Sequence, residues 1–298
     1  MNQSTHIEQV TVQAAAGSIQ GRVKNDALLF AGIPYAQAPV ESLRFRPPQP
    51  LARFSEPYPA LKFSPAAPQI PSGGMTDNAP VRWSEDCLYL NISAPLAVLE
   101  DGDAGGRAVM VWIHGGGYTS GQGAIPWYNG NRFAKNNDIV VVSINYRLGA
   151  LGFVDLTHLG EEFATSNING TLDQIAALQW VQDNIAAFGG DPSRVTIAGE
   201  SAGGFSVATL MACPSAEGLF QQAIPQSGAC HHTLPQEASK KVTEHFLDEL
   251  GLNSAVELEA ASADDILIAQ RATSAYFAQG AGQVNSLGVA VSPFYPVH

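Results

Sequence analysis

Short apolar runs alternate along the chain with segments of helical periodicity. Residues 109–113, 139–144 and 195–198 are nearly continuous runs of apolar and β-branched residues, which is typical of buried parallel strands. Residues 171–188 and 202–211 space their apolar side chains as amphipathic helices do. This alternation predicts an α/β fold with a central, mostly parallel sheet that is flanked by helices.

The segment 171–188 has the clearest helix signals. Thr171 and Gln174 fit a capping box at its start, and Gly189 follows its last apolar residue as a helix stop. One apolar stripe is expected to pack in the core, and it consists of Ile175, Leu178, Val181, Ile185 and Phe188.

The remaining segments complete the predicted domain. Residues 8–24 predict two strands that turn at Gly17, and residues 238–250 predict a helix. Residues 34–80 are rich in proline and polar turns, so they predict long surface loops. No linker divides the chain, and residues 1–298 are therefore expected to form a single domain.

The pentapeptide around Ser201 is the most informative motif. Gly199-Glu200-Ser201-Ala202-Gly203 lies between a predicted strand and a predicted helix. Such a strand–turn–helix setting is typical of a nucleophile elbow, which exposes an attacking serine. The serine needs strained backbone angles, and the flanking glycines avoid Cβ clashes. Ser201 is therefore the expected catalytic nucleophile.

A glycine-rich loop follows the strand at 109–113. Its sequence His114-Gly115-Gly116-Gly117 matches loops that donate backbone N–H groups to an oxyanion hole. We expect the amides of Gly116 and Gly117, together with that of Ala202, to form this hole. His114 precedes the serine, whereas the base of such a fold follows it, so a structural role is expected for His114.

Composition and charge exclude several partners. The 15 basic and 27 acidic residues give a net charge of −12, which argues against nucleic acid or an anionic membrane surface as partner. The three cysteines form no disulfide framework and have no zinc-site spacing. No phosphate-loop or dinucleotide motif occurs, so no cofactor or metal is expected. The N-terminus does not have the pattern of a signal peptide, which indicates a cytoplasmic protein.

Beyond these motifs, the sequence resembles the type B carboxylesterases, which include bacterial p-nitrobenzyl esterases and cholinesterases. The resemblance covers nearly the whole chain, at residues 30–36, 43–45, 84–91, 145–149, 172–174 and 188–203. It implies an α/β-hydrolase fold, hydrolysis of small carboxylic esters without a cofactor, Ser201 as nucleophile, and an oxyanion hole of Gly116, Gly117 and Ala202.

The family's triad consists of Ser, Glu and His in chain order, and its last two members normally lie far beyond the serine. Only 97 residues (298 − 201) follow Ser201. The resemblance therefore implies a fold that is incomplete at the C-terminus, and a triad acid and base that are not identified in this chain. His231 and His232 follow a segment similar to the family's acyl pocket, so they are minor candidates for the base.

Two functions remain open from the sequence. One is a serine carboxylesterase that acts on a small-molecule ester through an acyl-enzyme on Ser201. The alternative is a catalytically impaired fragment, or a non-catalytic binding protein built on an esterase scaffold. Retention of Ser201 and of the glycine loop favours the first, and loss of the acid and base favours the second. The sequence does not indicate an oligomeric state.

Overall fold

The computed structural model describes residues 9–70, 81–101, 106–252, 254–278 and 293–298. Its strands form one sheet in the order β1-β2-β3-β5-β7-β6-β8-β9, and the short β4 pairs with β2. The strands are β1 (Gln9–Ala14), β2 (Gly17–Lys24), β3 (Ala27–Pro34), β4 (Tyr58–Pro59), β5 (Tyr89–Pro95), β6 (Arg107–Ile113), β7 (Val140–Ile144), β8 (Gly190–Glu200) and β9 (Gln222–Gln226).

The sheet has an antiparallel part and a parallel part. Strands β1, β2, β3, β5 and β7 pair antiparallel with their neighbours in this order and form one half of the sheet. Strand β6 then pairs in parallel with β7 and β8, and β8 pairs in parallel with β9. Strands β6, β7 and β8 correspond to the three predicted buried strands. Because β6, β7, β8 and β9 run parallel, their carboxyl ends meet at one edge of the sheet, where α/β folds place their sites.

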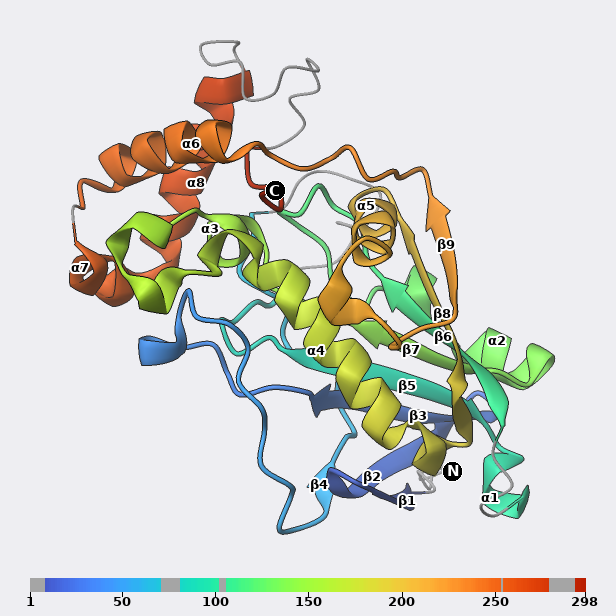
Figure 1. Cartoon of the computed structure of the whole chain (residues 1–298). Coiled ribbons are helices and arrows are strands. Elements are labelled where there is room, and N and C mark those ends of the chain that lie inside the picture. The colour runs from blue at the N-terminus through green and yellow to red at the C-terminus, as the bar shows by residue number, and fades with distance from the viewer. Residues whose placement is uncertain (1–8, 71–80, 102–105, 253, 279–292) are drawn as a thin grey trace, which may run out of the picture.

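Helices flank this sheet, as the sequence predicts. They are α1 (Val98–Asp101), α2 (Asn131–Asn137), α3 (Gly149–Phe153), α4 (Asn169–Asn184), α5 (Ala202–Leu210), α6 (Gln236–Leu250), α7 (Ala255–Ala260) and α8 (Ala263–Ala278). Helices α4 and α5 cover one face of the parallel strands (Figure 1). None of the helices in the described ranges has the length and apolar character needed to cross a membrane.

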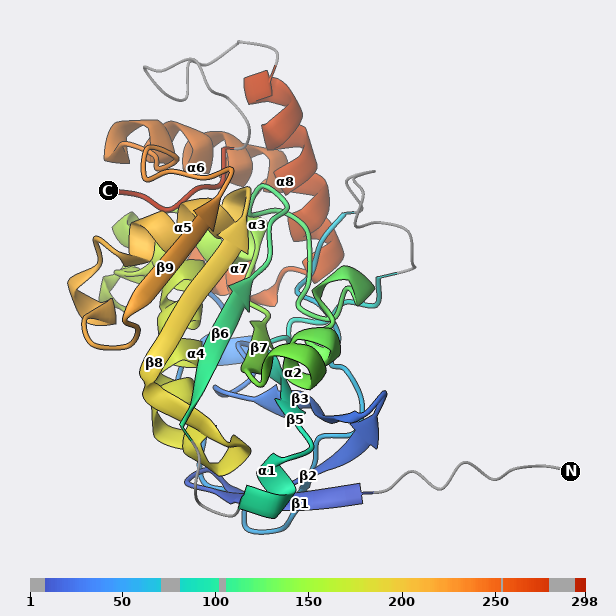
Figure 2. The same ribbon diagram turned by 90° about the vertical axis from the view of Figure 1, so that its right-hand side faces the viewer.

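The other face of the sheet is only partly covered. Helix α2 packs over β3, β5 and β7. No described helix lies over the same face of β6, β8 and β9 (Figure 2). Along β6, Val109, Val111 and Ile113 are buried, whereas the alternate residues Met110 and Trp112 on the opposite face are half-buried.

Strand β9 lies at the edge of the sheet. Among the described strands it pairs only with β8, and four of its five residues are exposed. Ile224, which is aligned with Ala198 on β8, is 45% exposed. The face of β6, β8 and β9 that no described helix covers (the bare face) therefore adjoins the open edge of the sheet at β9.

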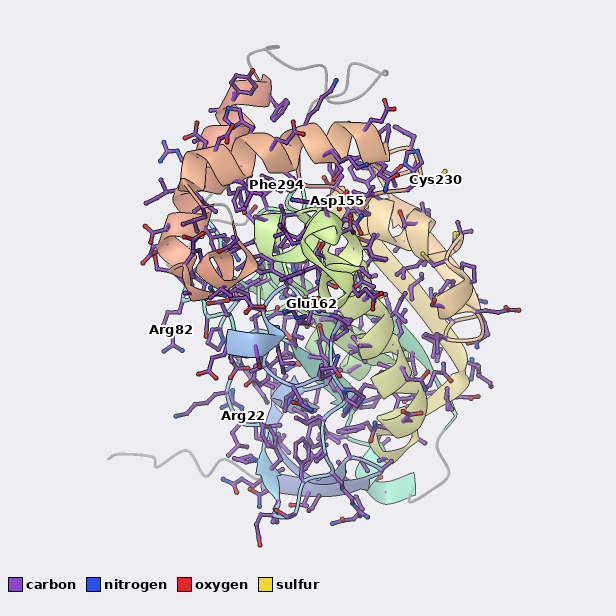
Figure 3. All side chains as sticks on the ribbon, turned by 60° about the vertical axis from the view of Figure 1, so that its left-hand side comes forward. Arg22, Arg82, Asp155, Glu162, Cys230 and Phe294 are labelled. Atoms are coloured by element: carbon purple, nitrogen blue, oxygen red, sulfur yellow. The ribbon has the colours of Figure 1, made fainter. Side chains whose placement is uncertain are left out.

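A helical layer lies beyond the carboxyl ends of the strands. Helices α6 and α8 pack against each other there, and α3 contacts α8 (Figure 1). The described residues 293–298 run beneath α6, where Phe294 meets Phe246 at 6.0 Å between ring centroids (Figure 3). Backbone hydrogen bonds join Leu234 to Pro296 and to His298, which fixes this segment against the start of α6.

A buried ion pair connects the segment after β7 to helix α4. Arg147 follows β7, and its side chain forms two hydrogen bonds of 2.7 and 2.8 Å with the carboxylate of Asp173 on α4. The same carboxylate accepts from the Arg147 backbone N–H, and Arg147 also donates to the carbonyl of Arg46. Both side chains are at most 2% exposed, so water does not compete for these bonds.

Most predicted elements are found close to their expected bounds, but β8 begins at Gly190, five residues before the predicted run at 195–198, and the capping box is wrong. Residues 71–80 of the predicted surface loops lie outside the described residues. Helix α4 begins at Asn169, two residues before Thr171, and its last apolar residues form a separate 3-10 turn, Ile185–Phe188. No side chain caps its N-terminus. Gln174 points into the core instead, where its Nε2 donates to the Ser206 hydroxyl. Because Gln174 is fully buried, a core partner replaces the predicted local one.

Candidate active site

Ser201 lies at the junction of β8 and α5 with a strained backbone. Its angles are φ 55° and ψ −122°, a combination that L-residues rarely adopt. The turn is held on both sides, because the Ser201 N–H donates to the Gln226 carbonyl and the Ser201 carbonyl accepts from the Phe205 N–H. Ser201 is half-buried, so its hydroxyl is presented at the carboxyl end of β8 rather than enclosed in the core.

The glycines on either side of Ser201 are required by close backbone contacts. A Cβ on Gly203 would lie 2.1 Å from the Ile113 carbonyl oxygen. A Cβ on Gly199 would lie 2.6 Å from the same oxygen and from the backbone of Gly203. Any side chain here would therefore push α5 away from β6. Close backbone contacts therefore require glycine at both positions, as the sequence predicts.

The glycine loop lies directly beside the elbow. Strand β6 pairs with β8 so that Ile113 is opposite Gly199, and residues 114–117 leave the sheet next to Ser201. A Cβ on Gly115 would lie 3.3 Å from the Ser201 Cβ and 2.5 Å from the Glu200 carbonyl. The parallel pairing of two strands thus brings together two motifs that are far apart in the sequence.

The amides of this loop are available to a ligand. Gly116 and Gly117 have φ angles of 117° and 61°, in the left-handed half of the backbone map. The Gly116 carbonyl accepts from the N–H groups of Thr119 and Ser120, which closes the loop into a tight turn. Among the described residues, no acceptor receives the N–H of Gly116 or Gly117. Ala202 adds the first N–H of α5, a group with no partner inside the helix.

The buried ring of His114 packs against the glycine loop. It is 1% exposed, its ring stacks on Tyr146 at 4.5 Å, and its Nδ1 lies 2.9 Å from the Gly115 carbonyl. Burial lowers the pKa of His114 to about 4, although the contact with Gly115 acts in the opposite direction. A neutral, enclosed ring of this kind agrees with the structural role expected for His114.

The candidate bases do not reach the nucleophile. His232 stacks on Phe205 of α5 with 3.6 Å between ring centroids, and His231 stands 4.2 Å from His232. Burial and the neighbouring His231 lower the pKa of His232, although a backbone contact with Ala229 opposes this. The hydroxyl of Ser201 has no hydrogen-bond partner among the described residues, so neither histidine is bonded to it.

Other histidines and the cysteines lie elsewhere. His245 on α6 packs against Tyr276 of α8 at 4.0 Å, rather than pointing into solvent from the polar face of its helix. Cys87, Cys213 and Cys230 are all free, and Cys230 lies at the surface (Figure 3). Within the described ranges, no three or more His, Cys, Asp or Glu side chains are grouped to hold a metal ion.

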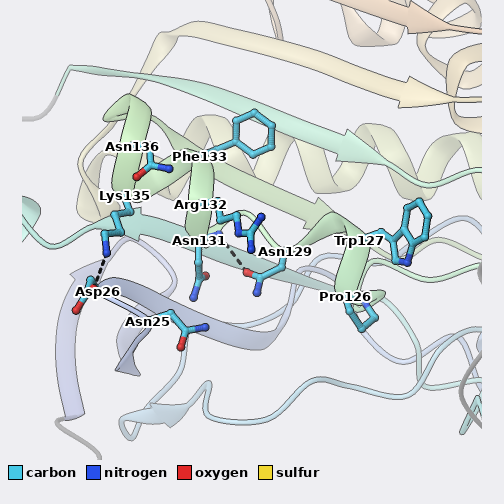
Figure 4. A pocket seen from close by; sticks show the side chains of 10 residues that line it. All are labelled: Asn25, Asp26, Pro126, Trp127, Asn129, Asn131, Arg132, Phe133, Lys135 and Asn136. Atoms are coloured by element: carbon cyan, nitrogen blue, oxygen red, sulfur yellow. Dashed lines mark hydrogen bonds and ion pairs between the residues drawn. The ribbon is translucent and has the colours of Figure 1, made fainter.

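A hollow of about 970 Å³ lies on a different part of the surface. Helix α2, the preceding turn at Pro126 and Trp127, and the β2–β3 turn at Asn25 and Asp26 line it (Figure 4). An ion pair of 2.6 Å between Lys135 and Asp26 crosses one end of it. None of its lining residues belongs to the glycine loop or to the elbow.

Comparison with known proteins places this geometry in context. The family model described as "Carboxylesterase family" matches residues 8–295. The chain is 42% identical to the para-nitrobenzyl esterase of Bacillus subtilis over 84% of this chain and 50% of that protein. It is 40% identical to the phenmedipham hydrolase of Pseudarthrobacter oxydans over 78% of this chain and 46% of that one.

Solved structures of esterases also match this chain. The carboxylesterase EST55 of Geobacillus stearothermophilus superposes with a TM-score of 0.82 at 39% identity, over 96% of this chain and 55% of that one. A thermophilic pNB esterase superposes with a TM-score of 0.86 at 38% identity, over 97% and 57% of the two chains. The predicted α/β-hydrolase fold is thus confirmed. The chain spans about half the length of the relatives that it matches.

Proposed function

The chain belongs to the carboxylesterase family, and on this premise we propose that it forms the nucleophile-bearing part of a serine carboxylic ester hydrolase. One observation carries the proposal above the others. The strained turn at Ser201 stands beside a loop whose Gly116 and Gly117 amides have no acceptor among the described residues. A strained residue next to unpaired backbone donors is costly to maintain, and it is typical of sites where the geometry serves the chemistry.

The proposed reaction begins with attack of the Ser201 hydroxyl oxygen on the carbonyl carbon of a small ester. Negative charge develops on the carbonyl oxygen, and the amides of Gly116, Gly117 and Ala202 stabilise it. Collapse of the tetrahedral intermediate breaks the bond to the alcohol and leaves an acyl group on Ser201. Water then attacks the acyl carbon, and the carboxylic acid leaves.

Proton transfer is the open step of this proposal. The Ser201 proton must pass to a base, and the leaving alkoxide must receive a proton. His231 and His232 are the candidates beside α5, and His232 would have to leave its stack on Phe205 to reach Ser201. Serine proteases that lack a triad member retain about 10³–10⁴-fold catalysis over water from their oxyanion hole and substrate binding.

The test uses the full chain of 298 residues with a p-nitrophenyl acetate assay and a fluorophosphonate probe. We expect the probe to label the wild-type chain and not Ser201→Ala. The variants His231→Asn and His232→Asn serve as matched tests of the base, and Cys230→Ser is a control on a neighbouring exposed residue.

Each outcome separates the alternatives. Labelling that survives Ser201→Ala would refute the assignment of the nucleophile. Turnover that depends on Ser201 and is lost in one histidine variant would identify the base. Labelling of the wild-type chain no faster than that of Ser201→Ala would favour the alternative function, an impaired fragment or a binding protein on an esterase scaffold.

We also propose a domain organisation, a class of partner and a cellular compartment for this chain. We propose one hydrolase domain over residues 1–298, because strands from β1 to β9 join one sheet. Membership of the carboxylesterase family supports a small ester as substrate, and the net charge of −12 argues against nucleic acid or an anionic membrane surface as partner. Three unpaired cysteines support residence in the reducing cytoplasm.

A further inference from the structure

Tyr118 directly follows the two glycines of the loop, and it is one of the largest fully buried side chains. Its ring meets Phe153 and Tyr295 edge-on, at 5.1 and 5.5 Å between centroids. Its backbone has a φ of 59°, and its carbonyl accepts from the Gly149 N–H at 2.6 Å. Tyrosine rarely adopts this backbone region, so the packing of the ring must hold it there.

The phenol group of Tyr118 reaches helix α5. The Ser206 hydroxyl lies 3.3 Å from the phenol oxygen and donates to it. Gln174 on α4 donates in turn to the Ser206 oxygen at 2.9 Å. Tyr118, Ser206 and Gln174 are at most 2% exposed, so these polar groups cannot exchange their partners for bulk water. Burial also raises the pKa of Tyr118, which keeps the phenol neutral.

The two ends of this link are the two sources of the proposed oxyanion donors. Tyr118 is bonded through the backbone to Gly117, while Ser206 stands one helical turn after Ala202 on α5. Strand pairing sets the distance between β6 and β8 but not the direction of the amides in a glycine loop. Donors to an oxyanion must be placed within about half an ångström, so a loop of three glycines needs a fixed point.

Core packing alone does not account for the hydroxyl. A phenylalanine would make the same edge-on contacts with Phe153 and Tyr295, and it would not require a polar partner in the core. The hydroxyl instead needs Ser206 and Gln174, two further buried polar side chains from two helices. A buried polar group that enlists others in this way fixes one arrangement of the elements that it joins.

We propose that Tyr118 is a positioning residue that, through its hydrogen bond to Ser206, fixes the Gly116 and Gly117 amides relative to the Ala202 amide. This inference rests on the proposed function, since it assigns a purpose to the same oxyanion hole. The link acts through the backbone of the loop, and Tyr118 itself does not touch the substrate.

The test compares Tyr118→Phe, Ser206→Ala and the double variant with Tyr35→Phe. Tyr35 is a matched control, because its buried phenol donates to the Asn145 carbonyl outside the glycine loop. For each chain we would measure the maximal rate of fluorophosphonate labelling, the probe concentration at half-maximal rate, and hydrogen exchange of the amides at 114–120 and 201–206.

We expect Tyr118→Phe to lower the maximal labelling rate about tenfold with little change in probe binding, because misplaced donors stabilise the transition state less well. Ser206→Ala should give a similar loss, and the double variant should add almost nothing to either. Amide exchange should rise at both segments in Tyr118→Phe and stay unchanged there in Tyr35→Phe.

Two results would overturn the inference. Equal losses in Tyr118→Phe and Tyr35→Phe would mean that general destabilisation explains the effect. Unchanged amide exchange at 114–120 in Tyr118→Phe would mean that the hydroxyl fixes nothing. If the wild-type chain is not labelled while the exchange pattern is as expected, the proposed function fails and the link between loop and helix stands.

Discussion

At the scale of single residues, His114 shows how the glycine loop is supported. Its ring is clamped between the Gly115 carbonyl and the face of Tyr146, and the Tyr146 hydroxyl donates to the His114 carbonyl at 2.8 Å. Burial of the ring favours its neutral form and outweighs the contact with the Gly115 carbonyl, which favours the protonated form. A proton on this ring would introduce a buried charge, which the fold tolerates poorly.

The pH dependence of stability should reflect this burial. The pKa of His114 is about 4 in the folded chain against an ordinary value of 6.5, so the unfolded chain binds a proton first as the pH falls. Stability is therefore lost between about pH 6.5 and 4, by about 3 kcal/mol in total, since one pKa unit corresponds to about 1.4 kcal/mol. Urea unfolding at pH 7.5, 6, 5 and 4.5 measures this loss.

His114→Gln is the control for that series, because glutamine stays neutral at every pH. The difference in unfolding free energy between wild type and variant should shrink as the pH falls. A difference that stays constant from pH 7.5 to 4.5 would show that His114 does not titrate in this window. His232, whose pKa is also lowered, contributes equally to both chains and cancels.

At the scale of elements, the buried pair Arg147–Asp173 joins the loop after β7 to α4. Asp173→Asn should lower the unfolding free energy by about 3–5 kcal/mol, because Arg147 would keep its charge in the core without a counter-ion. Chemical denaturation compares it with Asp138→Asn, which removes one ion-pair partner of Arg107 where the acid is 67% exposed. That exposed change should cost less than about 1 kcal/mol, and similar losses in the two variants would contradict the prediction.

Local patterns predicted the elements that build the site. The apolar run before Ser201 and the helix after it were both expected, and α5 ends within one residue of its predicted end. Local patterns failed where a distant contact decided the outcome. Gln174 fits a capping box in sequence, but Ser206 lies within its reach only once α4 and α5 pack together.

The same limit applies to the site. Ser201 and the glycine loop have sequence motifs, because strained turns require particular residues at fixed spacing. The link from Tyr118 to Ser206 has no such spacing, since two separate elements provide it. The stacking of His232 on Phe205, with His231 beside His232, likewise depends on how the segment after β9 returns over α5, which no periodicity encodes.

At the scale of the whole molecule, the bare face of β6, β8 and β9 adjoins an open sheet edge. Open sheet edges can pair with other chains, and Ile224 adds an exposed apolar side chain at this edge, so the described surface is expected to self-associate. Ile224→Lys should weaken this association at little cost in stability, because the side chain is already 45% exposed. Sedimentation velocity over a range of protein concentrations measures the effect.

Val256→Lys is the matched control, since Val256 is 76% exposed on α7, away from β9. Its sedimentation should match that of the wild type. Equal effects of the two lysines would mean that added charge in general, rather than the edge at β9, governs association.

The pairing of β6 with β8 also determines when the Ser201 turn can form in a growing chain. Ile113 pairs with Gly199, 86 positions later (199 − 113), whereas β1 and β2 pair across a two-residue turn. During translation the N-terminal strands can therefore pair early, while the elbow waits for Gln226, whose carbonyl holds the Ser201 amide, to leave the ribosome. The hydrogen bond that holds the Ser201 turn therefore cannot form until about three quarters of these residues have been made.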